Sequence, residues 1–223
     1  MDNTDKILHI QHYLFDFDGT LVDSMPYWAA SMVRVLDNHK VSHGDDIVRI
    51  ITPLGLNGTA NYFRTIGLEL SVQEILDEMY SYLTPLYCDR ILAKDGVKEC
   101  LEEMRKQGFH LHVLTASPHQ WLDPCLKRND LWELFDNVWS CDDFNTGNTD
   151  PEIYVRAAGR IGVPVSDVVF LDDNINADRT AKQAGMYVVG VFDETSRDDE
   201  DAIRELADGY VRDFHELQGF LSE

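Results

Sequence analysis

The sequence lacks the features of a membrane or secreted protein. It contains no apolar run of the ~20 residues that a bilayer-spanning helix needs, and it opens without a signal-peptide pattern. Cysteine is scarce, and its four positions include no C-x-x-C pair, which argues against a disulfide framework and against a zinc site. We therefore expect a soluble, cytoplasmic protein with reduced thiols.

Positive charge is also in short supply. Nineteen Lys and Arg residues stand against 40 Asp and Glu residues, which gives a formal net charge of −21. Such a balance argues against nucleic acid or an anionic membrane as a partner, because both repel a negative surface. No internal repeat or low-complexity tract appears, and the hydrophobic content of 44% is that of an ordinary folded domain.

Four short apolar segments are typical of buried strands. They lie around Leu14, end at Thr115, end at Leu171 and begin at Tyr187. Helical patterns fall between the later ones, and one of them has Asp150 as its N-cap, Pro151 at its first position and Gly162 after its end. Because strands and helices alternate, we predict an α/β fold with a Rossmann-like parallel sheet flanked by helices.

The interval after the first strand breaks this alternation. About 70 residues separate the first two strands, which is too long for a loop, and the interval carries helical stripes. The clearest stripe follows a capping box, Ser71-x-x-Glu74. We predict an α/β core formed by residues 1–22 and 92–223, with an inserted helical cap domain at 23–91.

Polar residues follow the predicted strands where each strand ends. Asp16 and Asp18 end the first, Thr115 ends the second, and Asp172 and Asp173 end the third. The carboxyl ends of parallel strands meet at one edge, so these side chains should converge. Carboxylate and hydroxyl oxygens suit a Mg²⁺ ion that holds a phosphate.

These motifs resemble a known family. The stretches D-F-D-G-T-L-V-D-S, L-T-A-S, D-P-E-I-Y and F-L-D-D-N…A-G-M occur in the order found in the haloacid dehalogenase-like (HAD) hydrolase superfamily. The resemblance covers essentially the whole chain. It is greatest to the helical-cap subgroup that includes phosphoglycolate phosphatase and β-phosphoglucomutase.

The resemblance implies a role for each strand-end residue. Asp16 would be the nucleophile that forms an aspartyl-phosphate, and Asp18 would be the general acid and base. Mg²⁺ would be held by Asp16, Asp173 and the backbone carbonyl of Asp18, with Asp172 bound directly or through water. The residues that would hold or approach the phosphate are Thr115, Ala116, Ser117, Gly19 and Asn148.

Two positions depart from the family's pattern. A lysine usually stands where this chain has Asn148, and an Asp or Asn often stands at Ala177 to support the metal loop. Asn148 can donate a hydrogen bond but carries no charge. The candidates to supply that charge from elsewhere in the chain are Lys94, Lys127 and Lys182.

The inserted helices would read the leaving group of the substrate. The resemblance implies that contacts come from a turn, expected here at residues 53–59. Asn57, Thr59 and Arg64 are candidate substrate contacts, although structural roles remain equally open for each.

The favoured function is a Mg²⁺-dependent phosphatase that hydrolyses a small phosphomonoester metabolite, such as a sugar phosphate. Asp18 favours phosphoryl transfer over dehalogenation, because a halide leaves without a proton whereas an alcohol oxygen departs better with one. One alternative is a phosphosugar mutase of the β-phosphoglucomutase type. Another is a pseudoenzyme that binds a phosphorylated ligand, which the neutral Asn148 suggests. The sequence does not identify the substrate or the oligomeric state.

Overall fold

The computed structural model describes residues 7 and 9–221 of the 223-residue chain. The chain folds as two compact units. The core unit consists of Met1–Asp23 and Leu92–Glu223, and the helical unit consists of Ser24–Ile91. None of the described helices combines the length and the apolar character that crossing a membrane requires.

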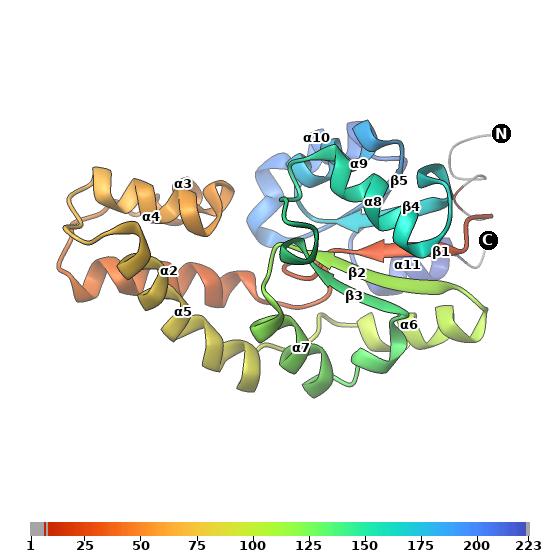
Figure 1. Cartoon of the computed structure of the whole chain (residues 1–223), viewed down its shortest axis with the longest axis horizontal. Coiled ribbons are helices and arrows are strands. Elements are labelled where there is room, and N and C mark those ends of the chain that lie inside the picture. The colour runs from red at the N-terminus through yellow and green to blue at the C-terminus, as the bar shows by residue number, and fades with distance from the viewer. Residues whose placement is uncertain (1–6, 8, 222–223) are drawn as a thin grey trace. The chain divides into compact units, whose positions relative to one another are not determined.

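A six-stranded parallel sheet forms the centre of the core unit (Figure 1). Its spatial order is β3-β2-β1-β4-β5-β6. The strands are β1 (His12–Phe15), β2 (His110–Thr115), β3 (Asn137–Ser140), β4 (Val168–Asp172), β5 (Tyr187–Val191) and β6 (Gly209–Val211). The four predicted strands are β1, β2, β4 and β5, so the predicted α/β fold with a parallel sheet is confirmed.

The two strands absent from the prediction, β3 and β6, lie at the edges of the sheet. β3 is mostly half-buried, and β6 has only three residues. An edge strand packs against one neighbour and needs no continuous apolar run, so its sequence carries a weak strand signal.

Apolar side chains alternate between the two faces of the sheet. Leu14 of β1 belongs to a buried cluster with α8 (Pro151–Ile161) and α9 (Ile175–Ala184) on one face. Phe15 points to the opposite face, where its ring stacks on Phe214 of α11 (Phe214–Phe220) at 6.2 Å. The remaining core helices are α6 (Val97–Lys106), α7 (His119–Arg128) and α10 (Glu200–Leu206).

The ends of α8 follow the prediction. The Asp150 side chain accepts a hydrogen bond from the Glu152 N–H, Pro151 occupies the first turn, and Gly162 ends the helix in a left-handed conformation with φ +94°. This helix packs Ile153 and Tyr154 against the sheet. Its start therefore fixes the loop that carries Asn148.

The helical unit contains α2 (Met25–Asn38), α3 (Ile47–Ile51), α4 (Gly55–Thr65) and α5 (Val72–Asp89). The predicted capping box is confirmed, since the Ser71 hydroxyl accepts from the Glu74 N–H and the Glu74 carboxylate accepts from the Ser71 N–H. The prediction of a turn at residues 53–59 is wrong. Thr52–Leu54 form a 3₁₀ turn and α4 begins at Gly55, because proline and glycine are tolerated at helix starts as well as in turns.

Three histidines lie side by side on the sheet. His12 and His110 are register partners of β1 and β2, and their rings lie 4.8 Å apart. The buried His112 lies 3.4 Å from His12 (Nε2 to Nδ1), and its Nδ1 lies 2.9 Å from the Asn137 amide nitrogen. Burial, followed by the neighbouring His12, lowers the pKa of His112 to about 4. The neutral imidazole is therefore the form that the fold favours.

This lowered pKa makes stability depend on pH. The unfolded chain takes up a proton at His112 near pH 6.5, whereas the folded chain resists until about pH 4. This contribution to the free energy of unfolding is thus present above pH 6.5 and is lost as the pH falls to 4, by up to about 3 kcal/mol. Denaturant unfolding at several pH values should give a shallower acid decline for His112→Gln than for the native chain. Equal declines in the two proteins would contradict the assignment.

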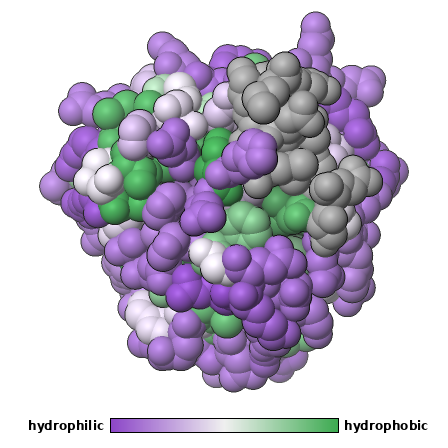
Figure 2. All heavy atoms as spheres, turned by 90° about the vertical axis from the view of Figure 1, so that its right-hand side faces the viewer, coloured by the Kyte–Doolittle hydropathy of each residue, from purple (hydrophilic) through white to green (hydrophobic). Residues whose placement is uncertain are grey.

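The face shown in Figure 2 is mostly hydrophilic, with hydrophobic side chains only in small separate areas. This agrees with a sequence in which 26% of the residues are charged.

Candidate active site

The functional residues gather at the carboxyl ends of the central strands. Asp16 directly follows β1, and its N–H donates to the Leu171 carbonyl of the neighbouring β4 at 2.9 Å. Thr115 is the last residue of β2, and Asp172 is the last residue of β4. Because these strands are parallel and adjacent, their ends bring the three side chains to one edge of the sheet.

Three of the acids form a cluster with the spacing of a metal site. One carboxylate oxygen from each of Asp16, Asp172 and Asp173 lies within 4.8 Å of the others. The three residues are buried, with exposed fractions of 9%, 2% and 6%. Carboxylates this close and this buried need a compensating charge. Hard oxygen donors in this arrangement fit a Mg²⁺ ion.

The electrostatics of the cluster lead to the same conclusion. Burial first, and then the charges of its neighbours, raises the pKa of Asp16 well above its usual range. The pKa of Asp172 is raised in the same way, and that of Asp173 rises to about 7. Each group is costly to ionise on its own. A bound cation would remove this cost and restore the charged forms.

Asp178 is a further acid of this site that the sequence analysis missed. It lies in α9, is fully buried, and neither of its carboxylate oxygens has a hydrogen-bond partner among the described residues. Burial, followed by the charges of Asp173 and Asp16, raises its pKa well above the usual range. An acid or amide that supports the metal loop was expected at position 177, where this chain has Ala177, one residue before Asp178. The available signal was helical spacing, since Asp178 falls three residues after the buried Ile175 and three before the buried Ala181.

The loop after β1 fits closely around the cluster. Gly19 has φ +78°, and a Cβ there would lie 2.7 Å from the Asp173 carboxylate oxygens. Only glycine suits this conformation and this approach. Thr20 donates a hydrogen bond to Asp173 Oδ1 at 3.1 Å.

Comparison with known proteins identifies the family. The family model described as haloacid dehalogenase-like hydrolase matches residues 13–191, which include the whole strand-end site. The chain belongs to the haloacid dehalogenase-like hydrolases.

Relatives within this hydrolase family include phosphatases. The chain is 27% identical over 206 residues to validoxylamine A 7'-phosphate phosphatase from Streptomyces hygroscopicus subsp. limoneus, over 92% of this chain and 94% of that protein. It is 28% identical over 185 residues to hexitol phosphatase B from Escherichia coli (strain K12), over 80% and 82% of the two chains.

Solved structures show the same fold. CbbY from Rhodobacter sphaeroides, in complex with phosphate, matches with a TM-score of 0.81 at 22% identity, over 96% of this chain and 100% of that one. A putative β-phosphoglucomutase from Thermotoga maritima matches with a TM-score of 0.76 at 23% identity, over 96% and 97%. At these identities the likeness establishes the fold alone.

Each of the three lysines proposed to replace the missing one in this hydrolase has partners other than Asp16, although the charge of Lys94 partly offsets the rise in the pKa of Asp173. Lys94 Nζ donates to the carbonyls of Gly19 and Phe192 and to Asp193 Oδ2, at 2.5, 2.9 and 2.9 Å. An ammonium has three hydrogens, so these bonds use all of its donors. Lys127 lies over the Trp132 ring at 4.3 Å, and Lys182 pairs with Asp208 at 2.7 Å. None of the three supplies a free charge to Asp16 in this arrangement.

The backbone of Asn148 contacts Tyr154 and Cys141. Its carbonyl accepts from the Tyr154 hydroxyl at 3.1 Å, and its N–H bonds the buried Cys141 thiol. Burial and then the Asp16 charge raise the pKa of that thiol to about 12, whereas the Asn148 N–H lowers it. The backbone of Asn148 and the Asp16 carboxylate thus both act on the Cys141 sulfur atom.

The candidate substrate contacts all lie on α4 of the helical unit. Asn57 and Arg64 are exposed there. Thr59 is buried, and its hydroxyl donates to the Ile51 carbonyl at 3.3 Å, which favours the structural role for this residue.

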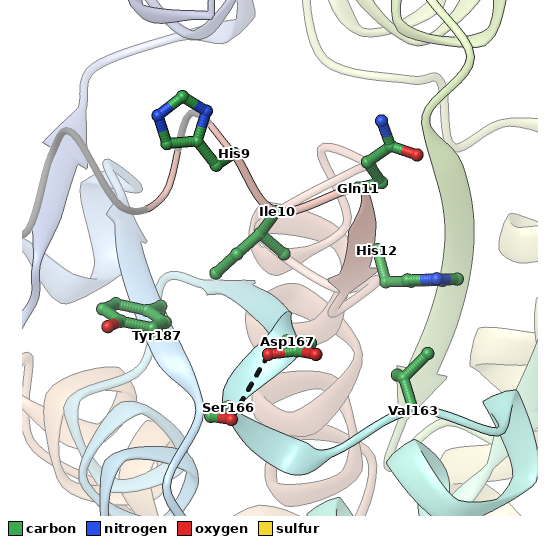
Figure 3. A pocket seen from close by; sticks show the side chains of 8 residues that line it. All are labelled: His9, Ile10, Gln11, His12, Val163, Ser166, Asp167 and Tyr187. Atoms are coloured by element: carbon green, nitrogen blue, oxygen red, sulfur yellow. Dashed lines mark hydrogen bonds between the residues drawn. The ribbon is translucent and has the colours of Figure 1, made fainter.

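A separate cavity of about 510 Å³ opens at the amino ends of the strands (Figure 3). It is lined by His9, Ile10, Gln11, His12, Val163, Ser166, Asp167 and Tyr187. None of these residues belongs to the strand-end acid site. The cavity therefore carries no part of the proposed chemistry.

Proposed function

We propose that the chain is a Mg²⁺-dependent phosphatase that hydrolyses a small phosphomonoester through an aspartyl-phosphate intermediate. The buried cluster of Asp16, Asp172 and Asp173 at the strand ends is the observation that carries this proposal. Asp18 at the same edge adds a second carboxylate beside the nucleophile, as phosphoryl transfer to and from an alcohol requires.

The reaction would proceed in two displacements at phosphorus. In the first, an Asp16 carboxylate oxygen attacks the phosphorus atom, the bond to the leaving oxygen breaks, and Asp18 gives that oxygen a proton. In the second, Asp18 removes a proton from water, whose oxygen attacks phosphorus and releases inorganic phosphate from Asp16. Asp18 therefore ends the cycle in the protonated form in which it began, with a proton that comes from water.

The residues that would hold Mg²⁺ are Asp16, Asp173 and the backbone carbonyl of Asp18, with Asp172 and Asp178 close by. Bound there, the ion would offset the repulsion between an anionic phosphate and the Asp16 carboxylate. Thr115, the backbone of Ala116 and the loop at Gly19 would surround the phosphate, and Asn148 would donate from the side.

The substrate is proposed to be a small phosphorylated sugar or polyol. The relatives named for validoxylamine 7'-phosphate and hexitol phosphates support this class of leaving group. Asn57 and Arg64 remain the proposed contacts on α4. A screen of phosphorylated metabolites that measures phosphate release would identify the substrate.

The helical unit gives no support to a mutase. A mutase would need a basic cluster there for a second phosphate, yet Arg34 lies over the Tyr82 ring at 4.2 Å and Arg49 pairs with Asp46 at 3.8 Å. The pseudoenzyme stays an alternative because Asn148 is uncharged and, among the described residues, each of the three lysines proposed to replace its charge has partners other than Asp16.

The Asn148→Lys variant decides between phosphatase and pseudoenzyme. A charge-assisted hydrogen bond contributes about 1.5–3 kcal/mol against about 1 for a neutral one, so the added ammonium should raise turnover by about one to two orders of magnitude. The assay is p-nitrophenyl phosphate hydrolysis with Mg²⁺ or with EDTA, for both proteins.

Mg²⁺-dependent turnover by the native chain would support the phosphatase. Activity that appears only in Asn148→Lys would favour the pseudoenzyme instead. An Asn145→Lys protein is the matched control, because it adds the same charge at an exposed position of the same loop.

A further inference from the structure

Ser117 makes a short hydrogen bond within the strand-end site. Its hydroxyl donates to Asp18 Oδ2 at 2.5 Å, joining the segment after β2 to the segment after β1 across 99 residues of sequence. Ser117 is buried, with an exposed fraction of 7%, and Asp18 is half-buried. A short bond to a carboxylate in such surroundings restricts the conformations of both side chains.

The backbone of Ser117 is itself held in place. Its N–H donates to Thr115 Oγ1 at 3.1 Å, and Pro118 follows as the residue before α7. Proline fixes the backbone at that point, so the hydroxyl is presented from a rigid turn rather than from a mobile loop. The Asp18 carboxylate is therefore bonded by a side chain whose own position is fixed.

A serine hydroxyl carries one hydrogen and so donates to one acceptor at a time. Donation to Asp18 and donation to a bound phosphate are thus alternatives, and the structure has the first of them. Donation to Asp18 also suits a residue that changes its protonation state. A protonated carboxyl group still has a carbonyl oxygen that accepts, so the bond survives in both states.

We propose that Ser117 is a positioning residue for Asp18: it holds the carboxyl group in the orientation from which a proton passes to the leaving oxygen. This inference rests on the proposed function, because it takes the acid role of Asp18 from it. It changes the expectation that Ser117 serves the phosphate. A group that acts on the phosphate affects every substrate alike, whereas a group that acts through Asp18 matters only when the leaving oxygen needs a proton.

The dependence on leaving group therefore tests the proposal. With enzyme in excess over substrate, the first turnover of an alkyl phosphate needs protonation, while that of p-nitrophenyl phosphate does not, since its phenolate is stable. Ser117→Ala should slow the alkyl phosphate by about tenfold and leave the aryl phosphate within about twofold, as expected when one charge-assisted bond is lost. Ser117→Thr, which keeps the hydroxyl, should restore the alkyl rate.

Two further variants keep the test decisive. Ser117→Cys preserves the size of the side chain with a weak donor, and it should reproduce the selective loss if Ser117→Ala does not fold. Ser140→Ala removes a buried hydroxyl from the end of the neighbouring β3 and should leave the ratio of alkyl to aryl rates unchanged.

If Ser117→Ala slowed the turnover of both substrates equally, the proposal would be overturned, and Ser117 would instead be a residue that binds the phosphate. No slowing of either would overturn it as well.

The Asp18→Asn variant separates failure of this inference from failure of the proposed function. If Asp18→Asn shows the selective loss and Ser117→Ala does not, only the positioning role fails. If Asp18→Asn shows none, the acid role of Asp18 fails first. In the Asp18→Asn background, adding Ser117→Ala should have no further effect on the ratio.

Discussion

Replacing Asp16 with asparagine is expected to lower turnover of p-nitrophenyl phosphate by at least about three orders of magnitude. Asparagine has nearly the same shape, but its amide oxygen is a poor nucleophile and carries no charge for a metal ion. The measurement is the steady-state rate in Mg²⁺, together with a search for phosphorylated protein after the reaction is stopped in acid. A native rate in Asp16→Asn would refute the nucleophile assignment.

The same substitution should stabilise the metal-free protein. Asp16 is buried among acids that raise its pKa, so its ionised form costs folding free energy when no cation is bound. Thermal unfolding in EDTA should therefore shift upward for Asp16→Asn, and the stabilisation by added Mg²⁺ should shrink. Asp198→Asn, the same change at an exposed position, is the control and should alter neither activity nor the Mg²⁺ response.

The centre of the fold was readable from the sequence because its strands are buried on both faces. β1, β2 and β4 are short apolar runs followed at once by polar residues, and a parallel sheet brings those residues to one edge. This is why Asp16, Thr115 and Asp172 were predicted together. The prediction needed only strand position and strand direction, both of which are local or nearly local signals.

What the sequence could not provide was the pairing of long, charged side chains. Lys94, Lys127 and Lys182 were equivalent candidates by sequence, and their partners became visible only through contacts between distant segments. Asp178 was not predicted as a site residue because an acid in the first turn of a helix is normally solvated and interacts favourably with the helix dipole. Its burial depends on how α9 packs on the sheet, which no local pattern reveals.

Replacing Asp18 with asparagine should separate the two half-reactions. The aryl substrate needs no proton to leave, so the first turnover of p-nitrophenyl phosphate should stay close to the native rate. Removal of the phosphoryl group then lacks its base, and later turnovers should slow by about two to four orders of magnitude. The expected trace is a burst of nitrophenolate equal to the enzyme concentration, followed by a slow phase.

The burst has a covalent counterpart. Asp18→Asn protein stopped during the slow phase should carry one phosphoryl group, seen as a mass increase by mass spectrometry and lost in Asp16→Asn,Asp18→Asn. An alkyl phosphate should give no burst, because its leaving oxygen requires the proton that asparagine does not supply. A burst with both substrates would mean that Asp18 serves only as the base. Native steady-state rates would remove Asp18 from the mechanism, and a different group would then have to supply the acid and the base that hydrolysis needs.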